Sequence, residues 1–478
     1  MIISSNAEEA KIVPPTGTSG GELKRNAVGL LHTIFQSQSH VAPAADVALL
    51  ITGTAAIALG ATPLVILLAW LGYFLLMNTN YQFSKYISSA SGYYGFAANG
   101  LGKRWGILVG WLFLGNEMLA YPAFGFLGAA SLIYLISPSI SSIPYLWIPL
   151  ILPFMAFVFI IEYLGIRPSL NYAWIAGIIE VSFLVITSLI IIFLVGPNNT
   201  LSVFTTAPTG GKLAPIFLAF IIGITTLAGS GSVVAISEET KQPKRNIPKS
   251  LVLVMLIDLS VILITYALTV GWGVSNMSSF ATAPDPGLLV FRHYLGIVGF
   301  IAFAIIIYNS YIMFGLAINN SLSRTMFGLA RDNVILPKKI FAVTHPKYKS
   351  PHRIIMLITL FGFVFAIING LVFGPFEGGV YPFVMIGLML ILVHLIDNFA
   401  LIRYIRKNHH KLNIITHILI PVVASVFLLL AIYYSLVPFP AFPYNVYAYI
   451  AAIWIVLGII YAVIKSKKVG DIATVNVD

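Results

Sequence analysis

Two stretches of this 478-residue chain place polar and flexible residues inside long apolar segments. The first reads QSQSHVAPAAD (residues 36–46), and the second reads TTLAGSGSVVAISEE (225–239). Pro43 cannot donate a backbone hydrogen bond and clashes with the preceding turn, so it predicts a kink or unwinding in the four residues before it. Gly229 and Gly231 each cost a helix interior about 1 kcal/mol relative to alanine. Both segments are therefore expected to be broken in their middle.

A broken helix exposes backbone groups that an intact helix satisfies internally. The N–H groups that begin one half-helix carry partial positive charge and suit a carboxylate, while the C=O groups that end the other half suit an ammonium. Two such breaks that cross would bind a zwitterion without formal charges. Matched interruptions in corresponding helices of two halves point to a transporter built from inverted repeats. Ordinary kinks or small-residue packing faces are the alternative explanation.

Glu180 is an isolated acid in the middle of an apolar segment, residues 168–195. A carboxylate at this depth costs roughly 2.5–3.5 kcal/mol on insertion scales, so it is expected to be protonated or paired. The side chain could exchange a proton with either side of a membrane, or hold sodium with oxygens of Asn319, Asn320 or Ser321. A neutral carboxyl group hydrogen-bonded between helices is the structural alternative.

Glu117, in the third apolar segment, could likewise bind a coupling ion or be a neutral structural carboxyl group. Contact with a substrate amine is a third interpretation. Asp397 is expected to pair with Arg403 at the inner membrane interface. Pairing or a place near the membrane surface best explains the remaining titratable residues in apolar surroundings, namely Asp46, Asp258 and His394.

The composition predicts an all-α integral membrane protein. Hydrophobic residues make up 59% of the chain and charged residues 9%, and the mean hydropathy is +0.94. A soluble domain could not bury that much apolar surface with so few charges, and the short alternating segments of a membrane barrel are absent. About twelve apolar segments have the length that a spanning helix needs: 27–58, 61–85, 104–136, 145–164, 168–195, 212–235, 249–272, 298–330, 353–374, 380–404, 413–436 and 443–465.

The formal net charge of +11 comes from basic residues whose positions along the chain agree with this topology. With the N-terminal tail inside the cell, nearly all Lys and Arg residues of the connections fall on the cytoplasmic side, and only Lys212 and Arg292 fall outside. This is the distribution of the positive-inside rule. The sequence therefore predicts a multi-pass protein of the cytoplasmic membrane with both termini in the cytoplasm, a lipid bilayer as its surroundings and no nucleic-acid partner. It does not define an oligomeric state.

The two breaks divide the chain into five-helix repeats of inverted topology, residues 27–195 and 212–404. Two additional helices occupy 413–465, and cytoplasmic tails occupy 1–26 and 466–478. The sequence shows no zinc-binding HExxH, no nucleotide-binding loop and no cysteine, so no enzyme activity and no cofactor is expected. The only bound ion expected is a coupling H⁺ or Na⁺.

Four motifs in this chain resemble the amino acid–polyamine–organocation (APC) superfamily. SEETKQPKRNIPKS (237–250) is similar to the signature after the sixth helix, in which two acids precede a Lys-x-Pro-Lys/Arg-x-x-Pro run. The other three are ASGYYGFAANGLGKRWGILVGW (90–111), GIRPSLNYAWIAGIIE (165–180) and RTMFGLARDNVILPK (324–338). The similarity covers helices one to ten in order.

The resemblance implies that the substrate's main chain binds at the two breaks. The residues concerned are Ser39, His40, Val41 and Ala42 in the first helix and Leu227, Ala228, Gly229, Ser230 and Gly231 in the sixth. Thr226 and Glu117 are further candidate binding residues. The wall that discriminates substrate side chains is expected to comprise His40, Leu227 and Gly231 with the aromatic Tyr121 and Phe124 of the third helix. The resemblance also implies an intracellular gate made of Glu238, Glu239, Lys244 and Arg245.

Three positions depart from the family pattern. Leu227 stands where an aromatic lid over the substrate is usual, and Gly231 stands where an acid is common, which suggests no counter-charge for a cationic side chain. Glu180 falls where some proton-coupled members place a lysine.

These observations predict a secondary active transporter that moves an amino acid, most simply a neutral one, by alternating access with a proton or sodium gradient. An exchanger for amines, polyamines or cationic amino acids is the alternative, which Glu117 would favour. An ion channel is disfavoured by the pair of breaks.

Overall fold

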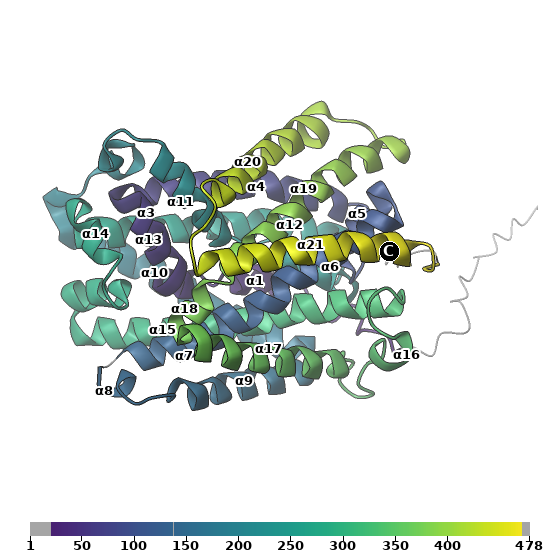
Figure 1. Ribbon diagram of the computed structural model, residues 1–478, viewed down its shortest axis with the longest axis horizontal. Helices are drawn as coiled ribbons and strands as arrows, with labels where there is room; N and C mark the ends of the chain where they lie inside the picture. The colour runs from purple at the N-terminus through teal and green to yellow at the C-terminus, as the bar shows by residue number, and fades with distance from the viewer. Residues whose placement is uncertain (1–20, 137, 471–478) are drawn as a thin grey trace, which may run out of the picture.

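The twelve predicted segments coincide with helices, each made of one helix or of consecutive shorter ones (Figure 1). The computed structural model describes residues 21–136 and 138–470, so the outer parts of both predicted tails, residues 1–20 and 471–478, lie outside the described residues. The described residues form no β-strand, and an isolated bridge pairs Val28 with Thr240. The predicted all-α class is confirmed.

The first half of the chain contains an interrupted helix followed by four apolar segments. In chain order its principal elements are α1 (Leu30–Val41), α2 (Pro43–Asp46), η1 (Val47–Ile51), α3 (Thr52–Ala58), α4 (Thr62–Ser84), α5 (Gly92–Leu101), α6 (Lys103–Ala120), η3 (Tyr121–Leu127), α7 (Gly128–Leu135), α8 (Pro138–Ser141), α9 (Trp147–Tyr163) and α10 (Ile166–Val195).

The second half begins with another interrupted helix. Its principal elements are α11 (Ala214–Thr225), η7 (Ser232–Glu239), α12 (Pro243–Ile257), α13 (Leu259–Trp272), α14 (Met277–Phe280), α15 (Pro286–Arg331), α16 (Lys338–Phe341), α17 (His352–Phe373), α18 (Pro375–Val380), α19 (Phe383–Lys407), η9 (Ile415–Leu419), α20 (Ile420–Leu436) and α21 (Tyr444–Ser466).

Among the described residues, nine helical stretches are long and apolar enough to cross a membrane. The stretch Leu30–Ser84 contains two predicted segments, which meet where Leu59 takes a φ of 51°. The stretch Pro286–Arg331 bends sharply at Gly296 (φ 67°, ψ −164°), so that residues 286–295 form a separate arm. Together with the shorter apolar helices α9 and α11, these stretches make a multi-span membrane fold.

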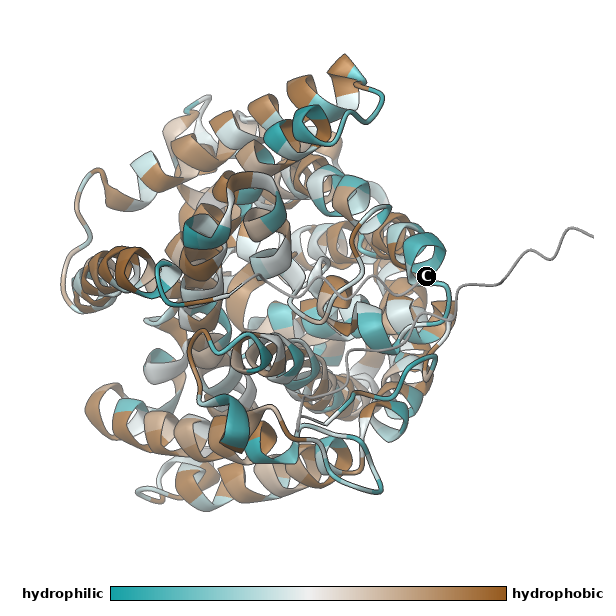
Figure 2. Cartoon of the chain, turned by 90° about the vertical axis from the view of Figure 1, so that its right-hand side faces the viewer, coloured by the Kyte–Doolittle hydropathy of each residue, from teal (hydrophilic) through white to brown (hydrophobic). Residues whose placement is uncertain are grey.

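Large apolar side chains are exposed on the flanks of the bundle. Phe193 on α10 is 80% exposed and Val298 on α15 is 75% exposed. Soluble monomers rarely leave extensive contiguous apolar surface uncovered, whereas the hydrocarbon core of a bilayer accommodates such surface. Figure 2 views the bundle along its length, with brown hydrophobic flanks around hydrophilic loops.

One end of the bundle gathers basic side chains and is called the basic end below. Lys103 of α6 and Lys244 of α12 lie in the first turns that begin there, and Arg331 of α15 and Arg406 of α19 lie in the last turns that end there. The opposite end is called the distal end. That the basic end faces the cytoplasm, and that the two halves form inverted repeats, stay predictions.

Candidate functional site

The first helix breaks where the sequence predicts. α1 ends at Val41, Ala42 adopts a left-handed conformation (φ 54°, ψ 61°), and α2 begins with Pro43. Proline suits the first position of a helix because the N–H that it lacks would have no partner inside the helix. The chain therefore resumes its helix after a one-residue interruption.

Side chains of two other helices occupy the backbone donors that this break exposes. The Ala44 N–H donates to Oε1 of Glu180 on α10 (2.9 Å), and the Ala45 N–H donates to Oγ of Ser310 on α15 (3.2 Å). The Ser310 hydroxyl donates in turn to the same Glu180 oxygen (2.8 Å). The Asp46 N–H donates to the carbonyl of Ala42 (3.0 Å). Glu180 thus caps the second half of the helix, in the place where an anion is favoured.

The sixth helix breaks between α11 and η7. Gly229 has a φ of 109°, and a Cβ at this position would lie 2.6 Å from Cδ2 of His40, so only glycine permits the close approach. The Ser230 hydroxyl donates to Oδ2 of Asp258 at the start of α13 (2.9 Å). The sequence did not identify Asp258 as an anchor of this break, although the pairing suggested for it is present.

The two broken helices touch each other directly. The Gln36 amide donates to the Ser232 hydroxyl (3.5 Å), which donates to the Gln36 carbonyl (3.5 Å). The Val233 N–H donates to the Ser37 hydroxyl (3.4 Å). These contacts fix the crossing on the basic side of the breaks.

A buried cavity of ≈ 40 Å³ lies beside this crossing. Five of the predicted binding residues line it: His40, Val41, Glu117, Ala228 and Gly229. The other lining residues are Asp46, Leu50, Asn116, Ala120, Phe124, Thr225, Phe314, Phe383, Ile386 and Leu390. The lining does not include the remaining predicted binding residues, Ser39, Ala42, Thr226, Leu227, Ser230 and Gly231.

The polar groups of the cavity are acidic or neutral. Oε1 of Glu117 lies 3.7 Å from Nε2 of His40, and its Oε2 accepts a hydrogen bond from Ser321 (2.9 Å). Asp46 is 1% exposed and its Oδ2 has no hydrogen-bond partner. None of the lining residues is Lys or Arg. The cavity therefore presents two carboxyl groups and no permanent cation.

Phenylalanine rings form the rest of the wall. The rings of Phe314 and His40 are perpendicular with centroids 5.4 Å apart, and Phe124 packs against Phe314 (4.7 Å) and Phe383 (6.0 Å). Phe124 was expected here, whereas Phe314 and Phe383 come from α15 and α19 and carried no distinctive sequence signal. Tyr121 is fully buried and packs on Phe126 (4.8 Å) rather than on the cavity.

Gly231 faces a different part of the protein. A Cβ on this residue would lie 2.2 Å from the hydroxyl oxygen of Tyr93 and 2.5 Å from Nδ2 of Asn80. The Asn80 amide donates to that Tyr93 hydroxyl (3.0 Å). The residue type at 231 thus sets the packing of the sixth helix against α4 and α5, and it bears less directly on the charge of the substrate than the sequence suggested.

The residues predicted to form one ion site lie in separate places. Asn320 donates to Oγ of Ser169 (2.8 Å), which joins α15 to α10. Ser321 contacts Glu117, whereas Glu180 contacts Ser310 nearer the distal end of α15. The described contacts therefore do not assemble a sodium shell of Glu180 with Asn320 and Ser321.

The two acids after the sixth helix are held by arginines of α15. The Arg331 guanidinium donates to both carboxyl oxygens of Glu238 (3.1 and 2.9 Å), and the Ala90 N–H also donates to Glu238 (3.0 Å). Arg324 donates to Glu239 (2.9 Å) and lies 3.5 Å from Glu162 on α9.

Lys244 and Arg245, the predicted gate partners, begin α12, and Arg245 is exposed. Glu238 and Glu239 form ion pairs with Arg331 and Arg324 of α15. The two arginines are seven residues apart in the RTMFGLAR motif, a spacing that places them on one helix face, and this signal was available in the sequence.

Residues 27 and 28, before α1, lie beside these ion pairs. The N–H groups of Ala27 and Val28 both donate to the carbonyl of Glu239 (2.7 and 3.1 Å), and the Lys241 N–H donates to the carbonyl of Val28 (2.8 Å). Arg167 of α10 donates to the carbonyl of Ala27 (2.8 Å). Residues 27 and 28 therefore tie the end of the sixth helix to α10.

Two residues expected to pair or to lie near the membrane surface lie instead inside the bundle. Asp397 is fully buried and neither of its carboxyl oxygens has a hydrogen-bond partner, while Arg403, its predicted partner, is exposed. His394, one turn earlier on α19, is 1% exposed, and both ring nitrogens lack hydrogen-bond partners.

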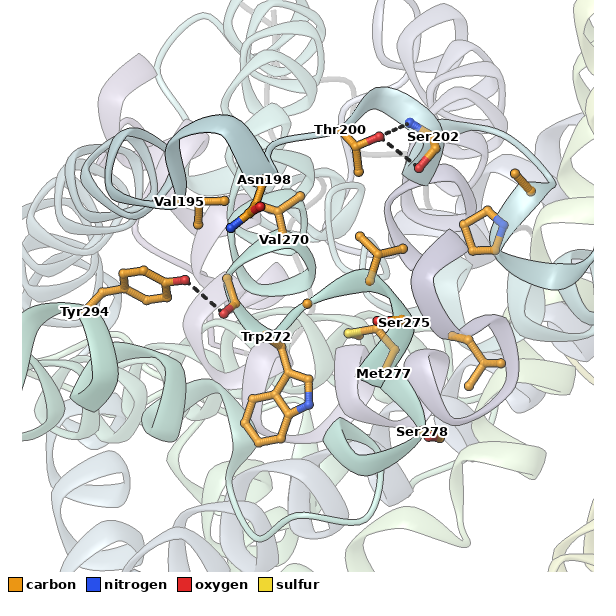
Figure 3. Close-up of a pocket in the computed structure, with 16 residues that line it drawn as sticks. Val195, Asn198, Thr200, Ser202, Val270, Trp272, Ser275, Met277, Ser278 and Tyr294 are labelled. Carbon is orange, nitrogen blue, oxygen red and sulfur yellow. Dashed lines mark hydrogen bonds between the residues drawn. The ribbon is translucent and has the colours of Figure 1, made fainter.

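A larger hollow of ≈ 710 Å³ opens at the distal end (Figure 3). Its lining carries no Asp, Glu, Lys, Arg or His, and Tyr294 there donates to the carbonyl of Gly271 (3.2 Å). It is built from Leu59, Val195, Asn198, Thr200, Ser202, Ala207, Pro208, Val270, Gly271, Trp272, Gly273, Val274, Ser275, Met277, Ser278 and Tyr294. Of these two cavities, the smaller one is lined by acidic and histidine side chains and the larger one is not.

A polytopic helical membrane protein whose two interrupted helices cross beside a buried polar cavity has the architecture of a secondary transporter. The family model described as "Amino acid permease" matches residues 32–473, and the chain belongs to this family. It is a membrane transporter and not an enzyme.

The chain is also similar to the "Low-affinity putrescine importer PlaP" of Escherichia coli strain K12 and of Escherichia coli O157:H7. The identity to each is 25% over 277 residues, which are 56% of this chain and 59% of the relative. The match thus spans less than two thirds of the relatives' length.

Proposed function

We propose that this permease carries an organic amine cation, such as a diamine, across the cytoplasmic membrane by alternating access. The observation that carries the proposal is the state of the first break: Glu180 and Ser310 already occupy the N–H groups of Ala44 and Ala45. A substrate carboxylate finds these donors taken. A substrate that brings only an ammonium group has no need of them.

The cavity chemistry supports a cation. Glu117 and Asp46 provide acidic groups on two different helices, and the faces of Phe124 and Phe314 attract a positive charge through the ring quadrupole. A carboxylate in the same place would meet two carboxyl groups and no Lys or Arg. The name of the putrescine importer with which the chain aligns agrees with this chemistry.

A neutral amino acid is the second candidate. The family description favours it, and Nδ1 of His40 is buried without a partner at the edge of the cavity. That nitrogen would be available to a substrate carboxylate, while Glu117 received the amine.

Transport requires the cavity to widen. Its ≈ 40 Å³ holds a few water molecules, whereas ligand pockets of small molecules occupy about 300–1,000 Å³. The ion pairs of Glu238 and Glu239 close the basic end, which we place in the cytoplasm on the positive-inside rule. Alternating access would break these contacts with each turnover, driven by a proton or sodium gradient.

The test is a binding panel of diamines, cationic amino acids and neutral amino acids with purified protein. We expect putrescine to bind, and Glu117→Gln to weaken binding about 10- to 100-fold, because a hydrogen bond to a charged group contributes roughly 1.5–3 kcal/mol. Glu377→Gln, an exposed acid on α18, is the matched control. Binding of neutral amino acids without binding of any diamine would replace the proposal by the second candidate.

A further inference from the structure

α19 carries a buried pair of titratable side chains that the proposed substrate site does not use. Leu390, which lines the cavity, His394 and Asp397 follow at spacings of four and three residues, so they lie along one helix face. The face leads from the cavity toward the basic end, where α19 terminates. Neither His394 nor Asp397 makes a hydrogen bond or an ion pair, and both are buried.

The rings that pack against His394 belong to two tyrosines. The rings of Tyr73 of α4 and Tyr93 of α5 pack nearly perpendicular to the His394 ring, with centroids 5.9 and 5.3 Å away. Tyr93 is also close enough to Asp397 and to Glu117 of α6 to interact electrostatically. Among the described residues, the titratable groups in ring contact with His394 are therefore the phenols of Tyr73 and Tyr93.

An unpaired carboxylate cannot persist in such surroundings. A buried charge without a partner is so unfavourable that the group neutralises instead, and acidic residues within membrane segments mark ion or proton pathways. A proton fits this place better than a metal cation, because hard cations need a shell of several oxygen ligands. Among the described residues, no group lies within hydrogen-bonding distance of either carboxyl oxygen of Asp397 to complete such a shell.

The pair also adjoins the break of the sixth helix. Gly231 packs against the hydroxyl of Tyr93 so closely that no Cβ fits between them. Tyr93 in turn contacts the ring of His394. A shift of η7 therefore changes the surroundings of His394 and Asp397 directly.

We propose that Asp397, assisted by His394, is the proton-binding site that couples transport to a pH gradient. Asp397 takes a proton from one side and releases it to the other when movement of the sixth helix changes its access. This inference rests on the proposed transport function, and it assigns the proton to α19 rather than to Glu180 on α10.

The first experiment needs no substrate. Infrared difference spectra of the purified protein, recorded between acidic and alkaline pH, should contain the band of a protonated carboxyl group that titrates and that disappears in Asp397→Asn. Glu377→Gln is the control that should leave the band unchanged. A band that persists in Asp397→Asn but disappears in Glu180→Gln would overturn the assignment.

The second experiment uses proteoliposomes and labelled putrescine. Asp397→Asn should lose accumulation driven by a pH gradient at least tenfold and retain counterflow exchange, and Asp397→Glu should restore accumulation. Retention of full accumulation by Asp397→Asn would overturn the inference while leaving the amine transport intact. Absence of putrescine transport by the unmodified protein would instead refute the proposed function, and the infrared result would still decide the protonation of Asp397.

Discussion

At the scale of single residues, Gly229 determines how closely the two broken helices approach. Its φ of 109° lies in a region that side-chain-bearing residues rarely adopt, and the His40 ring fills the space where a Cβ would lie. The glycine thus serves two purposes at once: it turns the chain, and it admits the side chain that contacts Glu117.

We expect Gly229→Ala to destabilise the protein by about 1–3 kcal/mol, the usual cost of such backbone strain, and to displace His40. Thermal unfolding in detergent would measure the change. Gly53→Ala is the matched control, since Gly53 is helical and the nearest atom to its Cβ would be 3.8 Å away. Equal effects of the two substitutions would contradict the role given to Gly229.

The sequence identified Gly229 and Gly231 together, but it could not separate their roles. Which way a residue faces after a break depends on the path of the unwound chain, and that path is set by partners such as Asp258 and His40 on other helices. The same reason explains why the sequence did not predict that Phe314 lines the cavity. Its spacing is that of an ordinary apolar helix, and only the tertiary packing brings it to the cavity.

At the scale of helices, Glu180 and Ser310 accept hydrogen bonds from the N–H groups of α2 that the break leaves without partners inside the helix. A buried N–H without an acceptor costs about 1–3 kcal/mol, so the position of Glu180 stabilises the break whatever part it plays in coupling. The sequence predicted both the break and the burial of Glu180. It could not predict their contact, because residues 44 and 180 meet only after α1 and α10 have packed together.

We expect Glu180→Ala to lower stability by about 1–3 kcal/mol, because it leaves the Ala44 N–H unpaired. Glu180→Gln should retain most of the stability, since its amide oxygen can still accept from Ala44 and Ser310. Comparing the two melting temperatures distinguishes a hydrogen-bonding cap from a required charge. If glutamine destabilises as much as alanine, the charge itself holds the helix.

At the scale of the whole molecule, the helical segments were predictable because each long apolar run has one stable solution in a bilayer. The ion pairs at the basic end were not. They join Arg324 and Arg331 of α15 to Glu239 and Glu238. Of these, Arg324 is fully buried with its partners, whereas the Arg331 side chain is 21% exposed.

Arg331→Gln is therefore expected to open the basic end and to lower stability by about 1–3 kcal/mol, because it leaves the buried Glu238 carboxylate without its ion-pair partner. The native chain has no cysteine, so a single cysteine in place of Ala228 reports access to the cavity. In the presence of Arg331→Gln, this cysteine should react with a polar thiol reagent several-fold faster than it does with Arg331 in place. Arg406→Gln, on the surface of the same end, is the control, and an equal acceleration there would argue against a gate.

The strap formed by Ala27 and Val28 has a practical consequence for work on this protein. Three backbone hydrogen bonds join these residues to Glu239 and Lys241, and at about 0.5–1.5 kcal/mol each they would make an open basic end roughly ten- to a thousand-fold rarer. A bulky fusion attached close to residue 27 would weaken the strap and shift the resting population of conformations. An affinity tag or reporter domain therefore belongs after α21, which is no part of this strap.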